Sequence, residues 1–287
     1  MKDFQSYEFS LLRNITSSDV ILEPFPHVVI KNALPDSFAK ILKSDFPLNK
    51  FQLDTNNVRQ DFSVCDLDAD TEIKDEWRDF IYFHSSDHFL LQILNIFEGH
   101  FPESKKLLNF LNRKNINTGR RKIDSYSDCD ILMDAQISIN SPVKKSNSVR
   151  KIHVDNSNKL FSGLFYLRSP DDNSIGGDLR LYSWKENYGN KEKLKFYQEG
   201  VAEKHVNFFQ EIKYDFNVLV LFPNSINALH GVTPREKTNQ VRTFVNLVGL
   251  LPFEFYEKPE ENFIRKKIIN TRALLSKVKR EVLGFRN

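Results

Sequence analysis

Six short apolar segments follow one another from about Asp134 to Leu251, and they constrain the fold more than any other feature of the sequence. Turn residues separate each segment from the next, and no helical pattern intervenes. Many short strands in this arrangement are typical of an antiparallel sandwich or barrel, such as a jelly roll. The segments are MDAQISIN, LFSGLFYL, GGDLRLYSW, HVNFFQEI, NVLVLFP and VRTFVNLVGLL.

Helices are expected on both sides of these strands. EPFPHVVIKNAL reads as a strand, and a helix follows from a cap at Asp36 and Ser37 to about Ser44. The stretch DEWRDFIYFHSSDHFLLQILNIFEG is helical in two parts, with Ser85 or Ser86 able to cap the second. The first two dozen residues look like a poorly anchored lead-in. The expected fold class is therefore mainly β with flanking helices.

The chain of 287 residues is expected to form one domain, because no internal repeat or low-complexity linker divides it. The expected parts are an N-terminal strand and helices over 1–130, a β core over about 131–255 and a helical tail over 256–287. The tail carries a strongly basic side, which could contact an anionic partner but which we interpret as a solvated helix face. Its cations are Arg265, Lys266, Lys267, Lys277, Lys279 and Arg280.

The overall charge does not indicate a nucleic-acid-binding surface. There are 41 basic and 38 acidic residues, a balance that disfavours a nucleic-acid partner. Cys65 and Cys129 are far apart, which favours a reduced intracellular protein over a disulfide framework. The N-terminus has no apolar core of signal-peptide length, and no segment is long enough to span a membrane. We expect a soluble, cytoplasmic protein, and the sequence predicts no oligomeric state.

The segment KIHVDN, just before LFSGLFYL, holds the first chemically suggestive pair. In a strand, side chains alternate between faces, so His153 and Asp155 would point one way. Ile152 and Val154 would then pack on the opposite side. The pair could be part of a metal site or simply two polar residues on a wet face of a sheet.

A second histidine and an arginine enlarge this pattern. His230 lies in FPNSINALHGVTP, at the end of the NVLVLFP strand and its following loop, 77 residues beyond His153. Two histidines and one carboxylate with open coordination positions form the facial triad of non-haem Fe(II) oxygenases. Arg242 follows His230 by 12 residues and opens an apolar strand, where a lone guanidinium needs a carboxylate partner. Arg235 could compete for that partner or bind an acidic substrate, and Arg168 could line the mouth of the site or be an ordinary surface arginine.

The order HxD, GLFYL, GGDLRLY, HGVTP and a downstream arginine resembles the prolyl-4-hydroxylase-like branch of the Fe(II)/2-oxoglutarate-dependent oxygenases. The resemblance covers about Asp134 to Leu251. It implies a double-stranded β-helix, a cupin-like variant of the jelly roll, with Fe(II) bound by His153, Asp155 and His230. It also implies that Arg242 holds the distal carboxylate of 2-oxoglutarate.

One part of the family's pattern is absent from this sequence. The branch often has a tyrosine on the strand before HxD, where this chain has MDAQISIN. Gln136 or Tyr166 could replace that second contact to 2-oxoglutarate, and Asn246 is expected to share a face with Arg242. Two polar segments are further candidates around the site: SPVKKSNSVRK as a mobile lip, and the insert from Lys185 to Lys204 as a cover or a plain connection.

The activity implied by the resemblance is a dioxygenase reaction that uses Fe(II), 2-oxoglutarate and O2, with ascorbate as an accessory reductant. Because Asp155 is present, hydroxylation is favoured over halogenation, although desaturation or cyclisation stay open. The substrate would be a small molecule or a prolyl or other amino-acid side chain, and succinate and CO2 would be released.

Two other classes of protein remain as alternatives. One is a non-catalytic jelly-roll binding module with a relic metal site, and the other is a cupin-type enzyme without a keto-acid co-substrate. A rival metal motif, HSSDH from His84 to His88, lacks a third ligand and reads better as a helix start. His27, His100 and His205 have no partners nearby in the sequence, and His27 reads as a half-buried strand residue.

Overall fold

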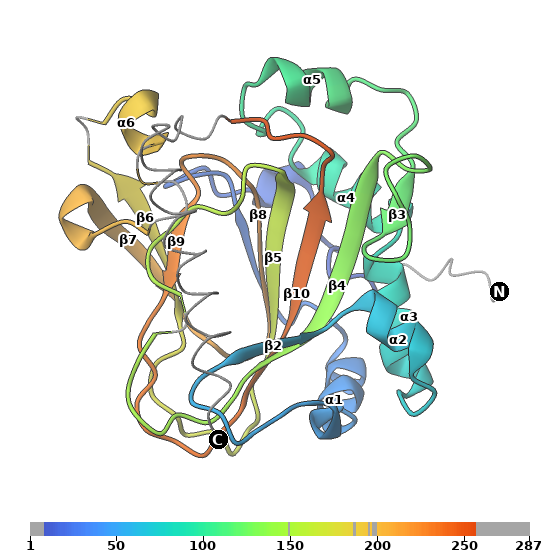
Figure 1. The fold of residues 1–287 in the computed structure, drawn as a ribbon, viewed down its shortest axis with the longest axis vertical. Helices are drawn as coiled ribbons and strands as arrows, with labels where there is room; N and C mark the ends of the chain where they lie inside the picture. The colour runs from blue at the N-terminus through green and yellow to red at the C-terminus, as the bar shows by residue number, and fades with distance from the viewer. Residues whose placement is uncertain (1–8, 149, 186–187, 195, 197–199, 257–287) are drawn as a thin grey trace, which may run out of the picture. The chain divides into compact units, whose positions relative to one another are not determined.

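Two β-sheets face each other at the centre of the protein (Figure 1). The computed structural model describes residues 9–148, 150–185, 188–194, 196 and 200–256, so the predicted basic tail lies outside the described residues. In this part of the chain the larger sheet has the order β1-β8-β5-β10-β4-β2, with β3 beside β4, and the smaller has the order β7-β6-β9. The strands are β1 (Val28–Lys31), β2 (Arg59–Phe62), β3 (Thr118–Arg120), β4 (Ile131–Asn140), β5 (Lys159–Leu167), β6 (Leu179–Trp184), β7 (Val206–Ile212), β8 (Phe216–Pro223), β9 (Leu229–Val232) and β10 (Arg242–Leu250).

The path of the chain between the sheets is that of a double-stranded β-helix. From β4 in the large sheet the chain crosses to the small sheet, where His153 pairs with His230 of β9 in an isolated bridge. It returns to the large sheet as β5, forms β6 and β7 in the small sheet, and then alternates through β8, β9 and β10. The predicted fold class is therefore confirmed, and all but the β3–β4 pairing are antiparallel.

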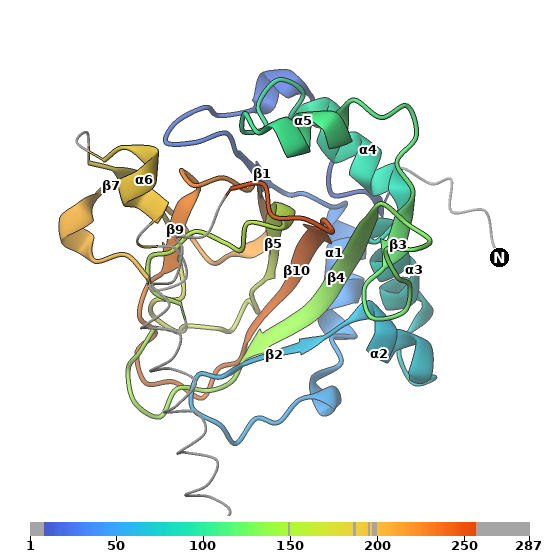
Figure 2. The same cartoon turned by 45° about the horizontal axis from the view of Figure 1, so that its top comes forward.

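Helices cover the outer face of the large sheet, on the side away from the small sheet (Figures 1 and 2). Their apolar side chains, such as Trp77 and Phe80 of α3, form one buried cluster with the outward-facing residues of the large sheet. The helices are α1 (Asp36–Ser44), α2 (Val64–Ala69), α3 (Asp75–His84), α4 (Asp87–Ile96), α5 (Lys105–Leu111) and α6 (Asn190–Leu194), with 3-10 turns at Ser17–Asp19, Leu48–Lys50 and Glu203–His205. α6 lies apart from the others, beside the small sheet, and comes between β6 and β7 in the chain, where no helix was predicted.

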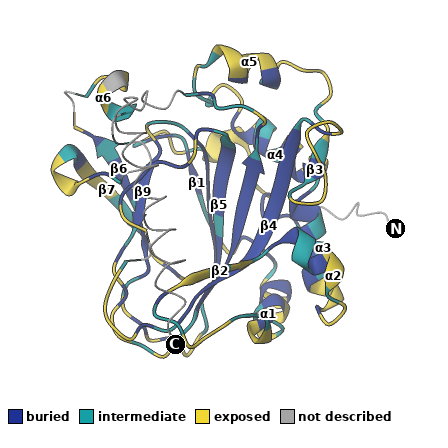
Figure 3. Ribbon diagram, viewed as in Figure 1, coloured by how far each residue is buried: buried dark blue, intermediate teal, exposed yellow. Residues whose placement is uncertain are grey.

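Strand β4 is buried along its whole length, and its two faces differ in chemistry (Figure 3). Its odd-numbered residues, from Ile131 to Ile139, belong to the apolar cluster beneath the helices. Its even-numbered residues point to the space between the sheets and include Asp134, Gln136 and Asn140. The same alternation in β10 gives the interior Arg242, Phe244 and Asn246, so the sheet that carries the helices also presents a polar interior row.

Most predicted elements are confirmed, and α1 ends where predicted, but its N-cap is Pro35, because Asp36 and Ser37, the predicted cap, lie inside the helix. The prediction of a poorly anchored lead-in is wrong for the described residues before β1, because Leu11 and Leu12 are buried and the Leu11 amide donates to His84. KIHVDN forms a single bridge rather than a strand, and His230 lies on β9 rather than in a loop. His27 is fully buried, not half-buried. Among the described residues, no helix has the length and apolar character that a membrane span requires.

Candidate active site

Three side chains that the sequence analysis singled out meet in the interior between the sheets. One ligand atom from each of His153, Asp155 and His230 lies within 4.8 Å of the others, and all three residues are buried. The Nε2 atoms of His153 and His230 lie 3.7 and 3.8 Å from the two carboxylate oxygens of Asp155. No other group of three potential metal ligands occurs in the described parts of the chain. The cluster can therefore offer two nitrogens and one oxygen to a single ion.

Backbone contacts hold both imidazole rings in the orientation that a metal site needs. His153 Nδ1 lies 2.8 Å from the Lys151 carbonyl oxygen, and His230 Nδ1 lies 2.9 Å from the Ala228 carbonyl oxygen. A carbonyl accepts only from a protonated nitrogen, so the proton is on Nδ1 and the Nε2 lone pair faces the other ligands. Burial and the neighbouring His153 lower the pKa of His230 to about 3, which keeps this ring neutral.

The Asp155 carboxylate is held in its charged form by polar neighbours. Ser162 Oγ donates to Oδ2 at 2.6 Å, and Lys159 Nζ lies 2.9 Å from Oδ1. Burial opposes ionisation, but opposing effects led by the positive charge of Lys159 hold the pKa of Asp155 well below its usual value. Tyr256 donates its hydroxyl to the Asp155 carbonyl oxygen and fixes the backbone here.

A cavity of about 380 Å³ opens beside this cluster. One wall comes from the interior faces of β4, β5 and β10, and the other comes from the small sheet with the segment before His153. Its lining residues are Arg59, Asn140, Arg150, His153, Asp155, Lys159, Ser162, Leu164, Leu179, Phe222, His230, Val232, Arg242, Phe244 and Asn246. A space of this size and mixed lining suits a small ligand.

Arg242 lines the cavity and retains an unused donor. It is 2% exposed, its Nε donates to the Gly177 carbonyl oxygen, and its Nη1 donates to Asn140 Oδ1. Its Nη2 and the Asn140 Nδ2 are buried and have no hydrogen-bond partner in the described structure. Buried donors normally have partners, so two such donors from paired positions of β10 and β4 fit an anionic ligand group.

The GGDL segment explains how Arg242 comes so close to the backbone. Gly177 has a φ of +84°, which favours glycine, and a Cβ there would lie 3.2 Å from the side chains of Arg235 and Arg242. Gly176, with a φ of +83°, lies even closer to its neighbours, since a Cβ would meet the Pro234 carbonyl oxygen at 1.9 Å.

The two competing arginines have other roles. Arg235 is 1% exposed and donates to the carbonyl oxygens of Ser141 and Gln240 and to Asn57, so it joins loops rather than lining the cavity. Burial and the nearby Arg242 lower the pKa of Arg235 to about 10. Arg168 donates to three carbonyl oxygens outside the cavity, which contradicts a place at its mouth.

The candidates for a second contact to a carboxylate differ in their positions. Asn246 lines the cavity on the same face as Arg242, and its Nδ2 donates to Gln136 Oε1 at 2.7 Å. Gln136 is engaged with Asn246 and Asp134 and does not line the cavity. Tyr166 is also outside the lining, but its ring lies 4.9 Å from the Arg242 guanidinium and its buried hydroxyl has no partner in the described structure.

The rival metal motif does not form a site. His84 ends α3, and both ring nitrogens are engaged, one with the Phe80 carbonyl oxygen and one with the Leu11 amide. His88 is exposed and pairs with Asp87.

The two polar segments near the site take different places. Ile152 and Val154 pack in an apolar cluster that the described residues Tyr188 and Phe196 of the insert join, on the face opposite the cavity. These residues of the insert therefore do not cover the site. The predicted lip is attached by backbone pairs of Val143 with Thr238 and Asn147 with Arg235, and its mobility stays a prediction.

Sequence reasoning missed several residues at the site. Asn140 and Arg59 come from paired positions of β4 and β2, and β2 itself was not predicted. Lys159 was also missed, although it follows Asp155 by four residues. A count of charged residues flanking HVDN would have drawn attention to both Arg150 and Lys159.

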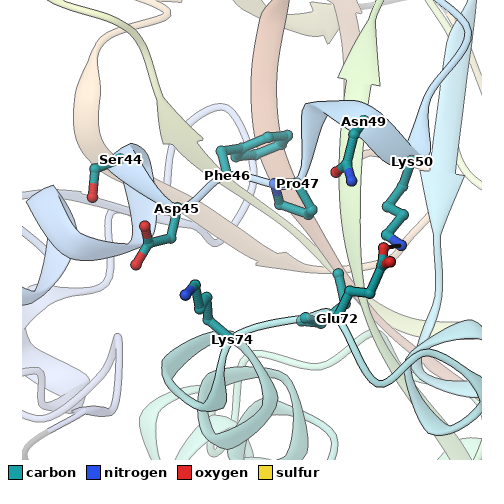
Figure 4. A pocket seen from close by; sticks show the side chains of 9 residues that line it. Ser44, Asp45, Phe46, Pro47, Asn49, Lys50, Glu72 and Lys74 are labelled. Atoms are coloured by element: carbon teal, nitrogen blue, oxygen red, sulfur yellow. Dashed lines mark hydrogen bonds and ion pairs between the residues drawn. The ribbon is translucent and has the colours of Figure 1, made fainter.

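A second, smaller hollow lies at the surface near the end of α1, and Figure 4 shows its lining. Its volume is about 200 Å³, and Lys50 in its lining pairs with Glu72 and Asp70. It holds none of the residues of the buried cluster, so we assign it no chemistry.

No family model matches the sequence, and no curated protein sequence matches it. Solved structures do match. A prolyl 4-hydroxylase from Phytophthora capsici aligns at 14% identity over 88% of this chain and 68% of its own, with a TM-score of 0.45. A prolyl hydroxylase from Trichoplax adhaerens, in complex with a hypoxia inducible factor peptide fragment, aligns at 18% identity over 87% of this chain and 94% of its own, also with a TM-score of 0.45. A Pseudomonas putida prolyl-4-hydroxylase aligns at 12% identity over 79% of this chain and 93% of its own, with a TM-score of 0.43. Similarity this low gives no information about substrate, and the assignment of this chain to the double-stranded β-helix proteins rests on its own strand order.

Proposed function

We propose that the protein is an Fe(II)- and 2-oxoglutarate-dependent dioxygenase that hydroxylates a C–H bond of a small molecule or an amino-acid side chain. The observation that supports this most strongly is the combination of a buried cluster of two histidines and one carboxylate with an unsatisfied arginine donor in the same cavity. This donor set, with positions left open, suits non-haem Fe(II).

Each residue has a definite part in this proposal. His153, Asp155 and His230 hold the metal, and the carbonyl contacts of the two rings keep their Nε2 lone pairs directed at it. Arg242 receives the distal carboxylate of 2-oxoglutarate through Nη2, and Asn140 Nδ2 is a second donor. Tyr166 and Asn246 lie next to this position. Bound Fe(II), with 2-oxoglutarate and O2, supplies the oxidation, with succinate and CO2 as co-products and ascorbate as an accessory reductant.

The remaining cavity wall limits what can reach the metal. Leu164, Leu179, Phe222 and Phe244 are apolar and line the same cavity as the ligand cluster and Arg242. Such a lining excludes water and orients the substrate while leaving the chemistry to the metal. We also propose a cytoplasmic location, because Cys65 and Cys129 are both free thiols.

The test is an anaerobic titration of the protein with Fe(II) and then with 2-oxoglutarate, followed by visible spectroscopy. We expect the weak metal-to-ligand charge-transfer band that a keto acid chelated to Fe(II) produces. The band should disappear in His230→Ala and Asp155→Ala. His88→Ala is the matched control, because this histidine is exposed and lies outside the cluster.

The outcome separates the proposal from its alternatives. A wild-type protein that binds no Fe(II) would be a binding module with a relic site. A protein that binds Fe(II) but gives no band with 2-oxoglutarate would favour a cupin-type enzyme and leave Arg242 without a ligand.

A further inference from the structure

The cavity holds more positive charge than the metal ligands and the co-substrate require. Four cationic side chains line it, Arg59, Arg150, Lys159 and Arg242, while Asp155 is the one carboxylate among the lining residues. In the proposed function, 2-oxoglutarate places one carboxylate on the metal and the other on Arg242. Arg59 and Arg150 are left without an assigned role.

Arg150 reaches the cavity from the side of the small sheet. Its carbonyl oxygen accepts from the Val232 amide at 3.0 Å, two residues after His230, which anchors its backbone beside the metal ligands. Its side chain is exposed and makes no hydrogen bond or ion pair with any residue that the structure describes. Because its guanidinium donors have no partner among the described residues, they can bind a carboxylate or phosphate group of a ligand.

Arg59 reaches the cavity from the edge of the large sheet. Its Nε donates to Asp61 at 2.8 Å, and its guanidinium lies 5.4 Å from the centre of the Phe244 ring. The two Nη groups have no partner among the described residues. Asp61 and Phe244 therefore hold the guanidinium in place while its outer edge stays available to a ligand.

Lys159 adds to the excess of positive charge once a metal is bound. Its partner is the Asp155 carboxylate, 2.9 Å away, which is the group that would bind the metal. A divalent ion bound to this carboxylate neutralises part of the carboxylate's negative charge, so part of the positive charge of Lys159 is no longer balanced.

We propose that the substrate carries an anionic group, a carboxylate or a phosphate, which Arg150 and Arg59 bind from opposite sides of the cavity mouth. This inference rests on the proposed function, since it assumes that Arg242 is occupied by 2-oxoglutarate. Opposite charge at the mouth also raises the local concentration of such a substrate, and added salt should weaken its binding.

The test uses protein loaded with Mn(II) and saturating 2-oxoglutarate, and the probes are inorganic phosphate and acetate. The paramagnetic ion accelerates the relaxation of 31P or 13C nuclei that bind near it, and a titration gives the affinity of each probe. The variants are Arg150→Gln, Arg59→Gln and the double variant. Lys145→Gln is the matched control, because Lys145 is an exposed cation of the same segment and does not line the cavity.

We expect saturable relaxation for at least one probe in the wild type and in Lys145→Gln. Each single variant should bind that probe about fivefold more weakly, and the double variant should show no saturation. The probe that binds more tightly identifies the group as a phosphate or a carboxylate. No saturation in the wild type, or equal binding in the double variant, would overturn the inference.

The charge-transfer band, measured on the same preparations with Fe(II), separates this result from the proposed function. If the wild-type band forms and neither probe binds, the dioxygenase stands and the anionic substrate does not. If the wild-type band is absent, both proposals fail.

Discussion

Replacing Arg242 with lysine tests the link between the metal cluster and the co-substrate. The change keeps a positive charge in a site that is 2% exposed, but it removes the planar fork of donors. Arg242 now donates to Gly177 and Asn140 and has Nη2 left over for a ligand. A lysine ammonium cannot reach these partners and a carboxylate in the same geometry.

The expected loss follows from the number of bonds removed. A hydrogen bond between charged groups contributes about 1.5–3 kcal/mol, so losing one from Nη2 should weaken 2-oxoglutarate roughly 10- to 150-fold. The affinity for Fe(II) without 2-oxoglutarate should change little, since Arg242 contributes no atom to the ligand cluster. Anaerobic titration of the charge-transfer band gives the 2-oxoglutarate affinity, and competition with a metal indicator gives the Fe(II) affinity.

Arg235→Lys is the matched control, because Arg235 is equally buried but contacts backbone outside the cavity. It should lower stability and leave the 2-oxoglutarate affinity of the folded protein close to that of the wild type. A wild-type affinity in Arg242→Lys, or an equal loss in Arg235→Lys, would show that Arg242 does not hold the carboxylate.

Three further predictions concern pH, charge and backbone. Burial lowers the pKa of His84 from 6.5 to about 3, so its stabilising contribution is complete above pH 6.5 and is lost as the pH falls toward 3. Over this range the free energy of unfolding should fall by about 1.4 kcal/mol per pH unit for this group. In urea unfolding, the plot of that free energy against pH should be less steep by this amount for His84→Gln, and an unchanged slope would contradict the prediction. Lys159→Gln should tighten metal binding several-fold, up to about tenfold, because it removes the positive charge that lies next to the Asp155 carboxylate. Weaker binding in a metal competition assay would mean that Lys159 instead orients this carboxylate. Gly176→Ala should destabilise the protein by at least about 2 kcal/mol, because its Cβ would overlap the Pro234 carbonyl oxygen. Gly99→Ala is the control, since Gly99 has a similar φ but no atom within 4 Å of a Cβ, and it should be destabilised only by the unfavourable φ angle. Equal melting temperatures for the two variants would refute the argument from overlap.

The strands of the core could be predicted from the sequence because the side chain of each residue, apolar or polar, indicates whether its position is buried. The run from Val218 to Phe222 is short and continuously apolar, which fits a strand buried on both faces, whereas Asn246 and Gly249 interrupt the apolar residues around Val245. The placement of His153 and Asp155 on one side also followed from the period of two. It holds in the structure even though KIHVDN makes only one bridge to β9.

The parts that sequence could not predict depend on contacts between distant segments. Strand β9 is four residues long and contains a glycine, so neither its length nor its composition marks it as a strand. It forms because Leu181 and Tyr182 of β6 pair with it on one side and His153 on the other. The role of Arg59 likewise depends on its pairing with Asn140, more than 80 positions away along the chain.

A single alternation connects the stability of the protein to its chemistry. In β4 and β10 the outward residues, such as Ile137 and Val245, pack beneath the helices. The inward residues between them, Asn140 and Arg242, therefore have little freedom to move, because a shift by one residue would bury the polar row under the helices. The cation–aromatic contacts of Arg242 with Tyr166, Tyr214 and Phe244, at 4.8–5.0 Å, hold it further. It follows that substitutions in the outward row should weaken ligand binding only to the extent that they destabilise the sheet. Substitutions in the inward row should weaken ligand binding in a protein that stays as well folded as the wild type.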